Sequence, residues 1–576
     1  MTNRNTLLLL LLFGLCFNCK KTTTEETTYG HITENAMVVS ARVEASKIGS
    51  EILEKGGNAF DAMFATEMAL AVTYPYAGNL GGGGFMVYRL NTGETGALDY
   101  REKAPLGSYS DMYLDSLGSV IPQKSTVGAY AVGVPGTIAG IFAAHEKFGS
   151  LPVATLLEPV IELAESGFYV TEKQHNRFAK YDSIFSVVND HRIIFNSSVL
   201  TNSKFKNLAL AETLKRIAAH GRDEFYSGQT GTQLVDFINQ HGGIITMDDL
   251  LLYEAKWRKP ITFQYDDLTI TSMSPPSSGG ICLAQIMKLI EPYDIDKYGP
   301  NSLEAIQVIV EAERLAYADR SYYLGDPDFV NIPKEALMND VYLQERMRNF
   351  SFDEAIASGN VSYGTIPDYT MELSETPRYH EHEETTHYSI VDQFGNAVSV
   401  TSTLNGAYGS KLYVDELGFF LNNEMDDFSS KPGVPNIYGL IGGQANAIAP
   451  QKRMLSAMTP TIIEKNGELY MVVGTPGGST IITSVLQTIL NVHEHGMTMQ
   501  EAVNAPRFHH QWLPDEIRME VSRFSEPLLK SLQEKGYYIN FDAAPITAKV
   551  DAILVRDDGS LEGGADPRGD DAAVGF

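Results

Sequence analysis

Cysteine is scarce in this chain of 576 residues, which contains only three. Two of them, Cys16 and Cys19, fall in the first twenty residues, so only Cys282 is left for the remainder. Disulfide bonds therefore cannot build the fold. Cys282 stands between two apolar residues, a context that predicts a core side chain rather than a nucleophile.

Basic residues are also few, with 44 Lys and Arg against 72 Asp and Glu, a formal net charge of −28. This charge repels a phosphate backbone and argues against nucleic acid as a partner. Hydrophobic residues make up 43% and charged residues 20% of the chain, as in ordinary globular proteins. The length is ample for a large core.

The N-terminus differs from the rest. Arg4 precedes an apolar run over residues 7–17, which is too short to cross a bilayer as a helix but suits the core of a signal peptide. With Cys16 and Cys19 at its end, the segment resembles a bacterial lipoprotein signal. We expect a signal over residues 1–19, lipidation at Cys19 (or Cys16), and a tether over 20–34. The product would be a periplasmic or outer-membrane lipoprotein; an ordinary secretory signal is the alternative.

Periodicity predicts helices and strands along the remaining chain. The expected strands are Met37–Ser40, 385–391, Ala397–Thr403, Thr461–Lys465 and 469–474, and the expected helices are 44–55, 58–73, 134–145, 303–322 and 481–492. The last four strands form two hairpins. Sheets combined with helices in this way indicate a layered domain.

Two segments have special composition. Four consecutive glycines at 81–84 predict a tight turn near a site, but no Gly-x-Gly-x-x-Gly follows a strand there, so a phosphate cradle is not indicated. Residues 351–384 are polar and rich in glutamate. They predict either a solvated loop or a mobile connection that is freed when the chain is cleaved.

Thr385 begins the first hairpin, in the sequence Thr-Thr-His-Tyr-Ser. A threonine hydroxyl is a weak nucleophile without a neighbouring base. If the bond after Glu384 is broken, the new α-amine, with a reference pKa of about 7.7–8.0, can be that base. The hydroxyl could break this bond itself through an ester that water hydrolyses. Threonines at a strand start are also simply typical of strands.

Several motifs in one order distinguish the chain. They are Gly-Gly-Asn-Ala-x-Asp-Ala from Gly56, the tetraglycine, Asp-Tyr-Arg-Glu-Lys-Ala-Pro from Asp99, Gly-Val-Pro-Gly-Thr from Gly133, Thr-Thr-His-Tyr-Ser, Leu-Asn-Asn-Glu-Met-Asp-Asp-Phe from Leu421, Lys-Pro-Gly-Val-Pro-Asn-x-Tyr-Gly-Leu from Lys431, Pro-Gly-Gly-Ser from Pro476, and Asn-Ala-Pro-Arg-Phe-His-His-Gln-Trp-Leu-Pro-Asp from Asn504. Nearly everything after about residue 30 thereby resembles the bacterial γ-glutamyltranspeptidases (γ-glutamyltransferases) that carry a lid loop.

The resemblance implies an α+β fold of the N-terminal-nucleophile hydrolase type, an αββα sandwich with two stacked sheets between helical layers. It implies cleavage between Glu384 and Thr385 into a large subunit, residues 35–384, and a small catalytic subunit, residues 385–576. The two would remain together as a heterodimer made from one precursor.

The resemblance also implies the substrate, glutathione and other γ-glutamyl compounds, whose glutamyl head carries a carboxylate and an ammonium. Residue by residue, it places Arg101 and Ser456 on the carboxylate, and Asp427 on the ammonium with help from Glu424 and Asn405. An arginine fork suits the first task.

For the chemistry, the resemblance makes Thr385 the nucleophile and Thr403 the hydroxyl that tunes it. Gly477 and Gly478 match the oxyanion hole, where backbone N–H groups face the developing negative charge. Tyr438 matches the gate of the lid loop. Ala457 departs from the family, which typically has a second serine there, and this weakens the expected grip on the carboxylate.

The resemblance implies acceptor amino acids or dipeptides as well as water, and no cofactor. Three histidines, His387, His509 and His510, have no zinc-site spacing, so no metal and no catalytic histidine are expected. Arg507 is expected to stabilise structure.

Two alternatives stay open at this point. One is a related acylase acting on glutaryl or poly-γ-glutamate substrates, which would have little need for Asp427. The other is a lipoprotein that keeps the fold but is neither cleaved nor catalytic.

Overall fold

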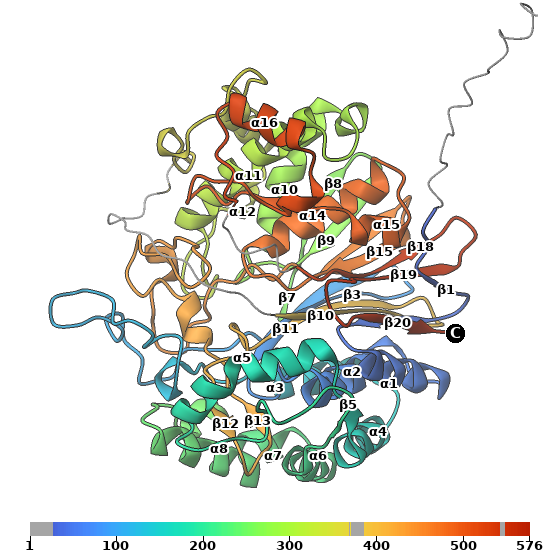
Figure 1. Cartoon of the computed structure of the whole chain (residues 1–576), viewed down its shortest axis with the longest axis vertical. Coiled ribbons are helices and arrows are strands. Elements are labelled where there is room, and N and C mark those ends of the chain that lie inside the picture. Colours follow the sequence, from blue (N-terminus) through green and yellow to red (C-terminus); the bar gives the residue numbers. More distant parts are fainter. Residues whose placement is uncertain (1–26, 368, 370–384, 542–547) are drawn as a thin grey trace, which may run out of the picture.

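The computed structural model describes residues 27–367, 369, 385–541 and 548–576 (Figure 1). Cys16, Cys19 and Glu384 lie outside the described residues, so the predicted signal, lipidation and cleavage bond stay predictions. None of the helices in the described part has the length and apolar character needed to cross a membrane.

Two seven-stranded sheets form the centre of the molecule, and all their pairings are antiparallel. The first sheet has the order β1 (His31–Thr33), β19 (Leu561–Ala565), β18 (Asp551–Val555), β15 (Glu468–Gly474), β14 (Thr461–Lys465), β9 (Leu268–Ser272) and β8 (Ile261–Tyr265). The second has the order β20 (Ala572–Gly575), β2 (Met37–Ser40), β10 (Thr386–Val391), β11 (Ala397–Thr403), β3 (Gly83–Arg89), β4 (Thr95–Asp99) and β7 (Lys256–Arg258).

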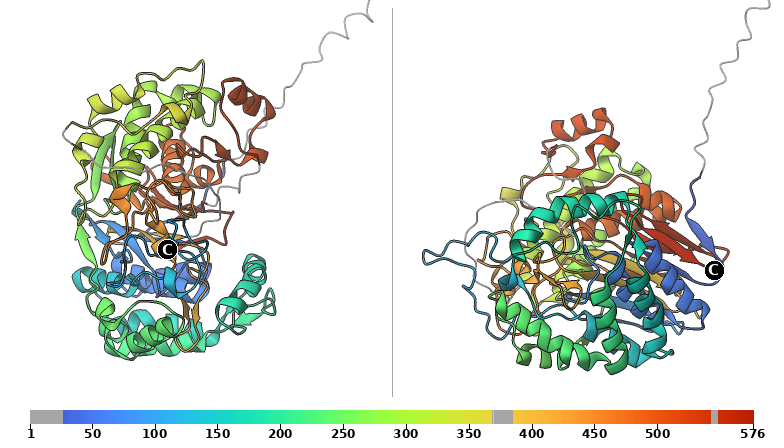
Figure 2. Two further views of the ribbon diagram at one scale, coloured as in Figure 1. Left: turned by 90° about the vertical axis from the view of Figure 1, so that its left-hand side faces the viewer. Right: turned by 60° about the horizontal axis from the view of Figure 1, so that its bottom comes forward.

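Helices cover the outer face of each sheet (Figure 1). On the side of the first sheet lie α10 (Gly279–Ile290), α11 (Leu303–Tyr323), α12 (Lys334–Leu337), α13 (Asp340–Met347), α14 (Thr480–His493), α15 (Met499–Asn504) and α16 (Glu526–Glu534). On the side of the second lie α1 (Val43–Glu54), α2 (Ala59–Thr73), α3 (Thr137–Phe148), α4 (Val153–Ser166), α5 (Glu172–Val188), α6 (Leu208–His220), α7 (Arg222–Tyr226), α8 (Gln229–Gln240) and α9 (Met247–Leu251). The turned views in Figure 2 show the same layers.

Three two-stranded sheets complete the described structure, and they lie outside the two large sheets. They are β5 (Phe168–Tyr169) with β6 (Lys204–Phe205), β12 (Tyr413–Val414) with β13 (Phe419–Phe420), and β16 (Phe508–His509) with β17 (Arg518–Met519).

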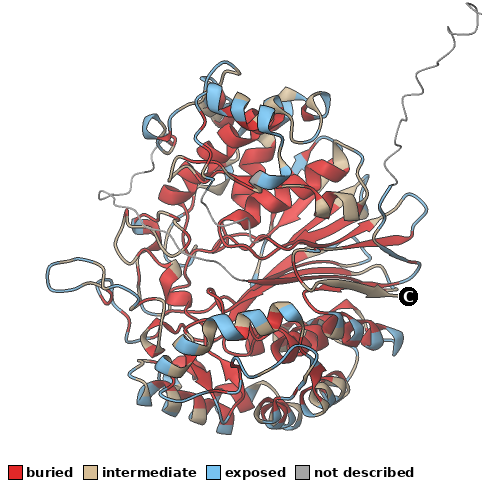
Figure 3. Ribbon diagram, in the orientation of Figure 1, coloured by how far each residue is buried: buried red, intermediate tan, exposed pale blue. Residues whose placement is uncertain are grey.

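Apolar side chains fill three layers, one between the sheets and one under each set of helices. Phe85 and Val472 belong to the core between the sheets, whereas Tyr388 and Ile390 belong to the core under the helices of the second sheet. Strands buried on both faces explain the near-continuous apolar runs of the sequence. Figure 3 shows the buried strands in red and the exposed outer helix faces in pale blue. This αββα arrangement is the predicted fold.

Strands from both predicted subunits pair within the second sheet. β10 lies between β2 and β11, and β11 in turn pairs with β3. Residues before and after Thr385 therefore build one shared core, as predicted, and neither part is a separate domain.

The predicted elements are present with small shifts of their ends. All of the expected strands and helices are found, and Asn58 caps α2 by accepting hydrogen bonds from Phe60 N and Asp61 N. Cys282 is fully buried in α10. Of the polar segment at 351–384, the described part is anchored in places, since Ser358 and Ile366 are buried; its mobility stays a prediction.

The glycine run at 81–84 is not the predicted tight turn. Gly83 and Gly84 begin β3, opposite Thr403 and Ser402 of β11, and none of the four glycines has a positive φ. A Cβ on Gly82 would lie 2.0 Å from the carbonyl oxygen of Thr403. The glycines are therefore required for close backbone approach, which lets β3 lie against the end of β11.

Candidate active site

Thr385 and Thr403 face each other at one end of the second sheet. Thr385 directly precedes β10, and Thr403 ends β11. The register pairs Thr386 with Ser402, and the Oγ atoms of Thr385 and Thr403 are 3.4 Å apart. The backbone N–H of Asn405 donates to Thr403 Oγ at 2.7 Å and thereby orients that hydroxyl. Both threonines are buried.

A charged cluster lies beside them. Arg101 follows β4, and Glu424 and Asp427 lie at the two ends of a 3₁₀ turn, Glu424–Asp427. The Arg101 guanidinium bonds to the carboxyl groups of both Glu424 and Asp427. Burial raises the pKa of both carboxyl groups, and the positive charge of Arg101 acts against it. In the free pocket, Arg101 is thus occupied by the protein's own acids.

Glu102, the next residue, adds a buried acid to this cluster. Neither of its carboxyl oxygens has a hydrogen-bond partner in the described structure. Burial raises its pKa to about 8, against the lowering influence of Arg101. Its Oε2 lies 3.7 Å from Arg101 Nη1, so Glu102 is a third buried acid beside that guanidinium.

The loop that carries Tyr438 closes over the cluster. The Tyr438 hydroxyl donates to Asn405 Oδ1, and Asn436 Nδ2 donates to Asp427 Oδ1 at 2.9 Å. The backbone N–H of Ile437 donates to Asp426 Oδ2 at 2.9 Å. These bonds tie the loop to the acids of the 3₁₀ turn, so the loop and the charged cluster are positioned together.

Gly477 and Gly478 form the turn between β15 and α14. Gly477 has φ +132° and Gly478 has φ +48°, backbone conformations that other residues rarely adopt. A Cβ on Gly477 would also meet Thr480 Oγ at 2.7 Å. Within the described residues, neither amide N–H has a hydrogen-bond acceptor. Two such donors beside a nucleophile can stabilise an oxyanion.

Ser456 and Ala457 form another wall of the site. Ser456 Oγ accepts a hydrogen bond from Met458 N at 3.1 Å, and its carbonyl accepts bonds from both the amide and the hydroxyl of Ser278. Ala457 contributes no hydroxyl. This wall therefore offers fewer side-chain donors than a pair of serines would.

One cavity joins these parts, and it brings together most of the predicted residues. Its lining includes the predicted Arg101, Thr385, Thr403, Asn405, Glu424, Asp427, Tyr438, Ser456 and Gly478, and also Arg320, Leu440, Ala457, Met458 and Ile481. Gly477 lies directly before Gly478 in the same turn. The cavity measures about 20 Å³, room for one water molecule, so a glutamyl group can enter only if the Tyr438 loop moves.

Arg320 is the lining residue that the sequence did not reveal. It lies on α11, which is buried along nearly its whole length. Because α11 also carries the buried charged residues Glu311, Arg314 and Asp319, nothing in the sequence marked Arg320 as a residue of the cavity.

The three histidines lie elsewhere. Burial lowers the pKa of His387 to about 3, and its ring nitrogens contact Thr401 and Ser389, not Thr385. His509 contacts Thr483 and Gln511. His510 contacts Asp515. None of these imidazoles contacts Thr385, so none is placed to act as its base.

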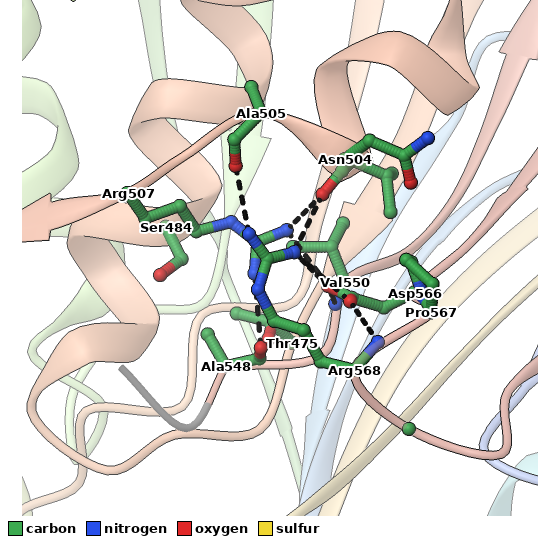
Figure 4. Close-up of polar contacts among 12 residues, drawn as sticks. Thr475, Ser484, Asn504, Ala505, Arg507, Ala548, Val550, Asp566, Pro567 and Arg568 are labelled. Carbon is green, nitrogen blue, oxygen red and sulfur yellow. Dashed lines mark hydrogen bonds and ion pairs between the residues drawn. The ribbon is translucent and has the colours of Figure 1, made fainter. Parts of the chain in front are cut away.

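Arg507 connects three segments of the small subunit, and Figure 4 shows it beside Ala548 and Asp566. Its guanidinium bonds to Asp566, to the carbonyl of Val503 and to the carbonyl of Ala548 at 2.7–3.0 Å. The Ala548 backbone packs against Gly477. These contacts give Arg507 a structural place, as predicted.

A possible cation-binding group lies on the surface, away from this cavity. Within the described ranges, Asp266, Asp267 and His493 alone have ligand atoms close enough to share an ion. His493 Nε2 lies 3.0 Å from Asp266 Oδ2, and Lys465 Nζ pairs with Asp267 at 3.2 Å. They give no reason to involve a metal in the cavity.

Comparison with known proteins agrees with this geometry. The family model for gamma-glutamyltranspeptidase matches residues 45–576. The glutathione hydrolase proenzyme of Escherichia coli K12 is 44% identical over 550 residues, covering 94% of this chain and 92% of that protein.

Two solved structures are also similar. The Helicobacter pylori gamma-glutamyltranspeptidase has a TM-score of 0.56 and 38% identity, covering 60% of this chain and 97% of that one. The cephalosporin acylase of Bacillus halodurans has a TM-score of 0.82 over 97% of this chain and 99% of that one, but only 23% identity. The second likeness shows the fold alone.

Proposed function

Because this chain belongs to the γ-glutamyltranspeptidase family, we propose that it matures by cleavage before Thr385 and then uses Thr385 on γ-glutamyl amides. It is an enzyme, a γ-glutamyltransferase and glutathione hydrolase of the N-terminal-nucleophile fold. The observation that carries the assignment of Thr385 is its place, 3.4 Å from Thr403 at a cavity lined by Arg101, Glu424 and Asp427.

Maturation uses the same hydroxyl as catalysis. The E. coli relative is named a proenzyme, in keeping with a precursor that is cut. Thr385 Oγ attacks the carbonyl carbon of Glu384, and the peptide nitrogen becomes the free α-amine of Thr385. Water then hydrolyses the ester that joins Glu384 to the Thr385 oxygen. The large and small subunits stay together because they share the second sheet.

Catalysis repeats this chemistry on the substrate. Thr385 Oγ attacks the γ-carbonyl while the α-amine accepts its proton, and the oxyanion forms opposite the N–H groups of Gly477 and Gly478. The α-amine of Thr385 then passes this proton to the amine of the substrate, which leaves. A γ-glutamyl ester remains on Thr385. Water resolves this ester in hydrolysis, and the amino group of an amino acid or dipeptide resolves it in transfer.

Recognition of the glutamyl head requires an exchange of ion pairs. The substrate ammonium joins Asp427 and Glu424, near Asn405, and the substrate carboxylate joins Arg101 and Ser456. Tyr438 moves to admit the head and then covers it. In the empty pocket, Arg101 pairs with Asp427 and Glu424. The ion pairs with the substrate replace these internal ion pairs.

The acylase alternative has less support. The acids around Arg101 suit an α-ammonium, which a glutaryl group lacks. The chain is also more similar to the glutathione hydrolase proenzyme of E. coli, at 44% identity, than to the acylase ACY 1 proenzyme of Pseudomonas sp. V22, at 33% identity over 93% of this chain. Relative turnover of γ-glutamyl-p-nitroanilide and glutaryl-p-nitroanilide decides between them, and preference for the glutaryl compound would reject our substrate class.

We further propose that the protein is exported as a lipoprotein. Residues 1–19 form the signal and Cys19, or Cys16, carries the lipid. Labelling with a radioactive fatty acid would test this, because Cys19→Ala should abolish labelling if that residue is modified, and Cys16→Ala should do so in the other case.

The central experiment is N-terminal sequencing of the small fragment combined with the γ-glutamyl-p-nitroanilide assay. We expect a fragment that starts at Thr385 and activity that appears with cleavage. The Thr385→Ala variant should stay as one chain and be inactive, whereas Thr385→Ser keeps a hydroxyl and should still be cut. Efficient cleavage of the alanine variant, or an uncut active wild type, would contradict the mechanism.

A further inference from the structure

Two arginines line the cavity, and they differ in their partners. Arg101 is bonded to Glu424 and Asp427. Arg320 reaches the cavity from α11 and is only 4% exposed. In the described part of the chain, no carboxylate lies within ion-pair distance of Arg320, and neither of its Nη groups has an acceptor. Arg320 is thus the cation of the cavity that is not neutralised by direct contact.

The one hydrogen bond of Arg320 links it to the wall of the cavity that Ser456 and Ala457 line. Arg320 Nε donates to Ser278 Oγ at 2.9 Å, and Ser278 Oγ donates to the carbonyl of Ser456 at 2.7 Å. These two hydrogen bonds link the guanidinium to Ser456 and leave its two Nη groups for another acceptor. The adjacent Ala457 supplies no hydroxyl, so an anionic ligand at this wall needs hydrogen-bond donors from another residue.

The charge of Arg320 is retained despite its position. Burial lowers its pKa, while Cys282, Tyr317 and Asp427 raise it, and a guanidinium stays protonated in proteins. A buried charge is costly unless it is paired. An unneutralised guanidinium at a cavity wall therefore indicates that an anionic ligand completes the site.

We propose that Arg320 binds the α-carboxylate of the γ-glutamyl group, beside Ser456 and together with Arg101. The two Nη donors of a guanidinium fit the two oxygens of a carboxylate. The ammonium then faces Asp427 and Glu424, so positive and negative groups alternate around the substrate head. This inference rests on the proposed γ-glutamyl activity and adds a specificity-determining residue to it.

Three p-nitroanilides separate the charges of the substrate. The γ-glutamyl compound has both the carboxylate and the ammonium, the glutaryl compound has only the carboxylate, and the 4-aminobutyryl compound has only the ammonium. The purified, cut enzyme is assayed with each, and rates are normalised to the amount of small subunit that begins with Thr385.

The Arg320→Gln variant removes the charge. We expect KM to rise by about 30-fold or more for the two compounds that have the carboxylate, because a buried charge pair loses one partner. The 4-aminobutyryl compound should change by less than about threefold. An equal loss with all three compounds would overturn the proposal and would indicate a structural role.

The matched control is on the same helix. Arg314 is as buried as Arg320 but bonds to Glu311, Ser358 and Asp515, outside the cavity. Arg314→Lys should affect the three compounds equally. Arg320→Lys keeps the charge but loses the fork, so it should raise KM selectively for the two compounds that have the carboxylate. If Arg320→Gln is not cut, Arg320→Lys is assayed with the three compounds in its place.

Inhibition constants give a second readout that does not need turnover. In Arg320→Gln, the inhibition constant of L-glutamate should rise far more than that of 4-aminobutyrate, and an equal rise would count against the proposal. Failure of the proposed function looks different, because wild-type enzyme would then not cleave the γ-glutamyl compound at all.

Discussion

Arg101 and Asp427 are bonded directly to each other across the empty pocket, although they bind opposite ends of a glutamyl head in our proposal. The residues are 326 positions apart in the chain. Their contact means that substrate must compete with an internal ion pair. It also means that removing either partner leaves a buried charge behind.

The Asp427→Asn variant tests this competition. We expect KM for γ-glutamyl-p-nitroanilide to rise by about 30-fold or more, since losing one partner of a buried charge pair costs about 2–5 kcal/mol. Glutaryl-p-nitroanilide, which has no ammonium, should not be slowed. Steady-state kinetics with both compounds measures this, and equal losses would show that Asp427 does not recognise the ammonium.

Thr403→Val removes the hydroxyl that contacts the nucleophile while keeping the shape of the side chain. Asn405 N then loses its acceptor, and Thr385 loses a neighbouring hydroxyl. We expect kcat to fall by about 10-fold to 100-fold, because a hydrogen bond lost in a buried site costs about 1–3 kcal/mol. Thr403→Ser keeps the hydroxyl and should retain most activity; similar losses in both variants would point to packing instead.

Gly477→Ala should disrupt the oxyanion turn. The φ of +132° disfavours alanine, and the new Cβ would meet Thr480 Oγ. We expect slow precursor cleavage and a fall in kcat by at least about 100-fold, the size of a lost oxyanion donor. Gly467 is the control, because it has φ +82° and open space around it in the β14–β15 hairpin. Gly467→Ala should lose some stability but keep its activity, as gel analysis and kinetics would show.

Glu67 gives the fold a predictable pH dependence. It is buried under β11, accepts a bond from Ser402 Oγ at 2.6 Å, and burial raises its pKa from 4.5 to about 7. Since the folded pKa lies above the unfolded value, folding favours the protonated form, and this stability is lost as pH rises from about 4.5 to about 7. The loss is on the order of 3 kcal/mol.

Urea unfolding at pH 5 and pH 8 measures this loss, with Thr385→Ala as the uncut background. Adding Glu67→Gln should remove that part of the pH dependence. Glu54→Gln, at an exposed position of α1, should leave it unchanged. An unaltered pH dependence in Glu67→Gln would contradict the prediction.

Local sequence patterns predicted part of the fold, namely five strands and five helices. Hairpins, capped helices and apolar runs are signals carried by neighbouring residues, and these elements appear where expected. Strands β8 and β9 are among those missed, although Ile261, Phe263 and Tyr265 alternate with polar residues as in a strand. The glycine run was assigned to a turn because sequence alone does not show which backbone will approach it.

The candidate site was harder to predict from the residues themselves. The chemistry of an N-terminal threonine gave a reason to consider Thr385, but the family resemblance was needed to single it out. Its partners come from distant segments whose meeting depends on the whole fold. Family resemblance supplied Arg101 and Asp427 without showing that they bond to each other. Arg320 had no motif to mark it, and only its place at the cavity wall, without a carboxylate beside it, makes it stand out.

Because β10 lies inside the second sheet, unfolding has different consequences before and after the chain is cut. Before the cut, unfolding and refolding are events within one molecule, independent of concentration. After the cut, the two pieces can drift apart once the strands separate, and recovery requires an encounter between them. The mature enzyme should therefore depend on slow unfolding for its lifetime, and its precursor alone should refold readily at high dilution.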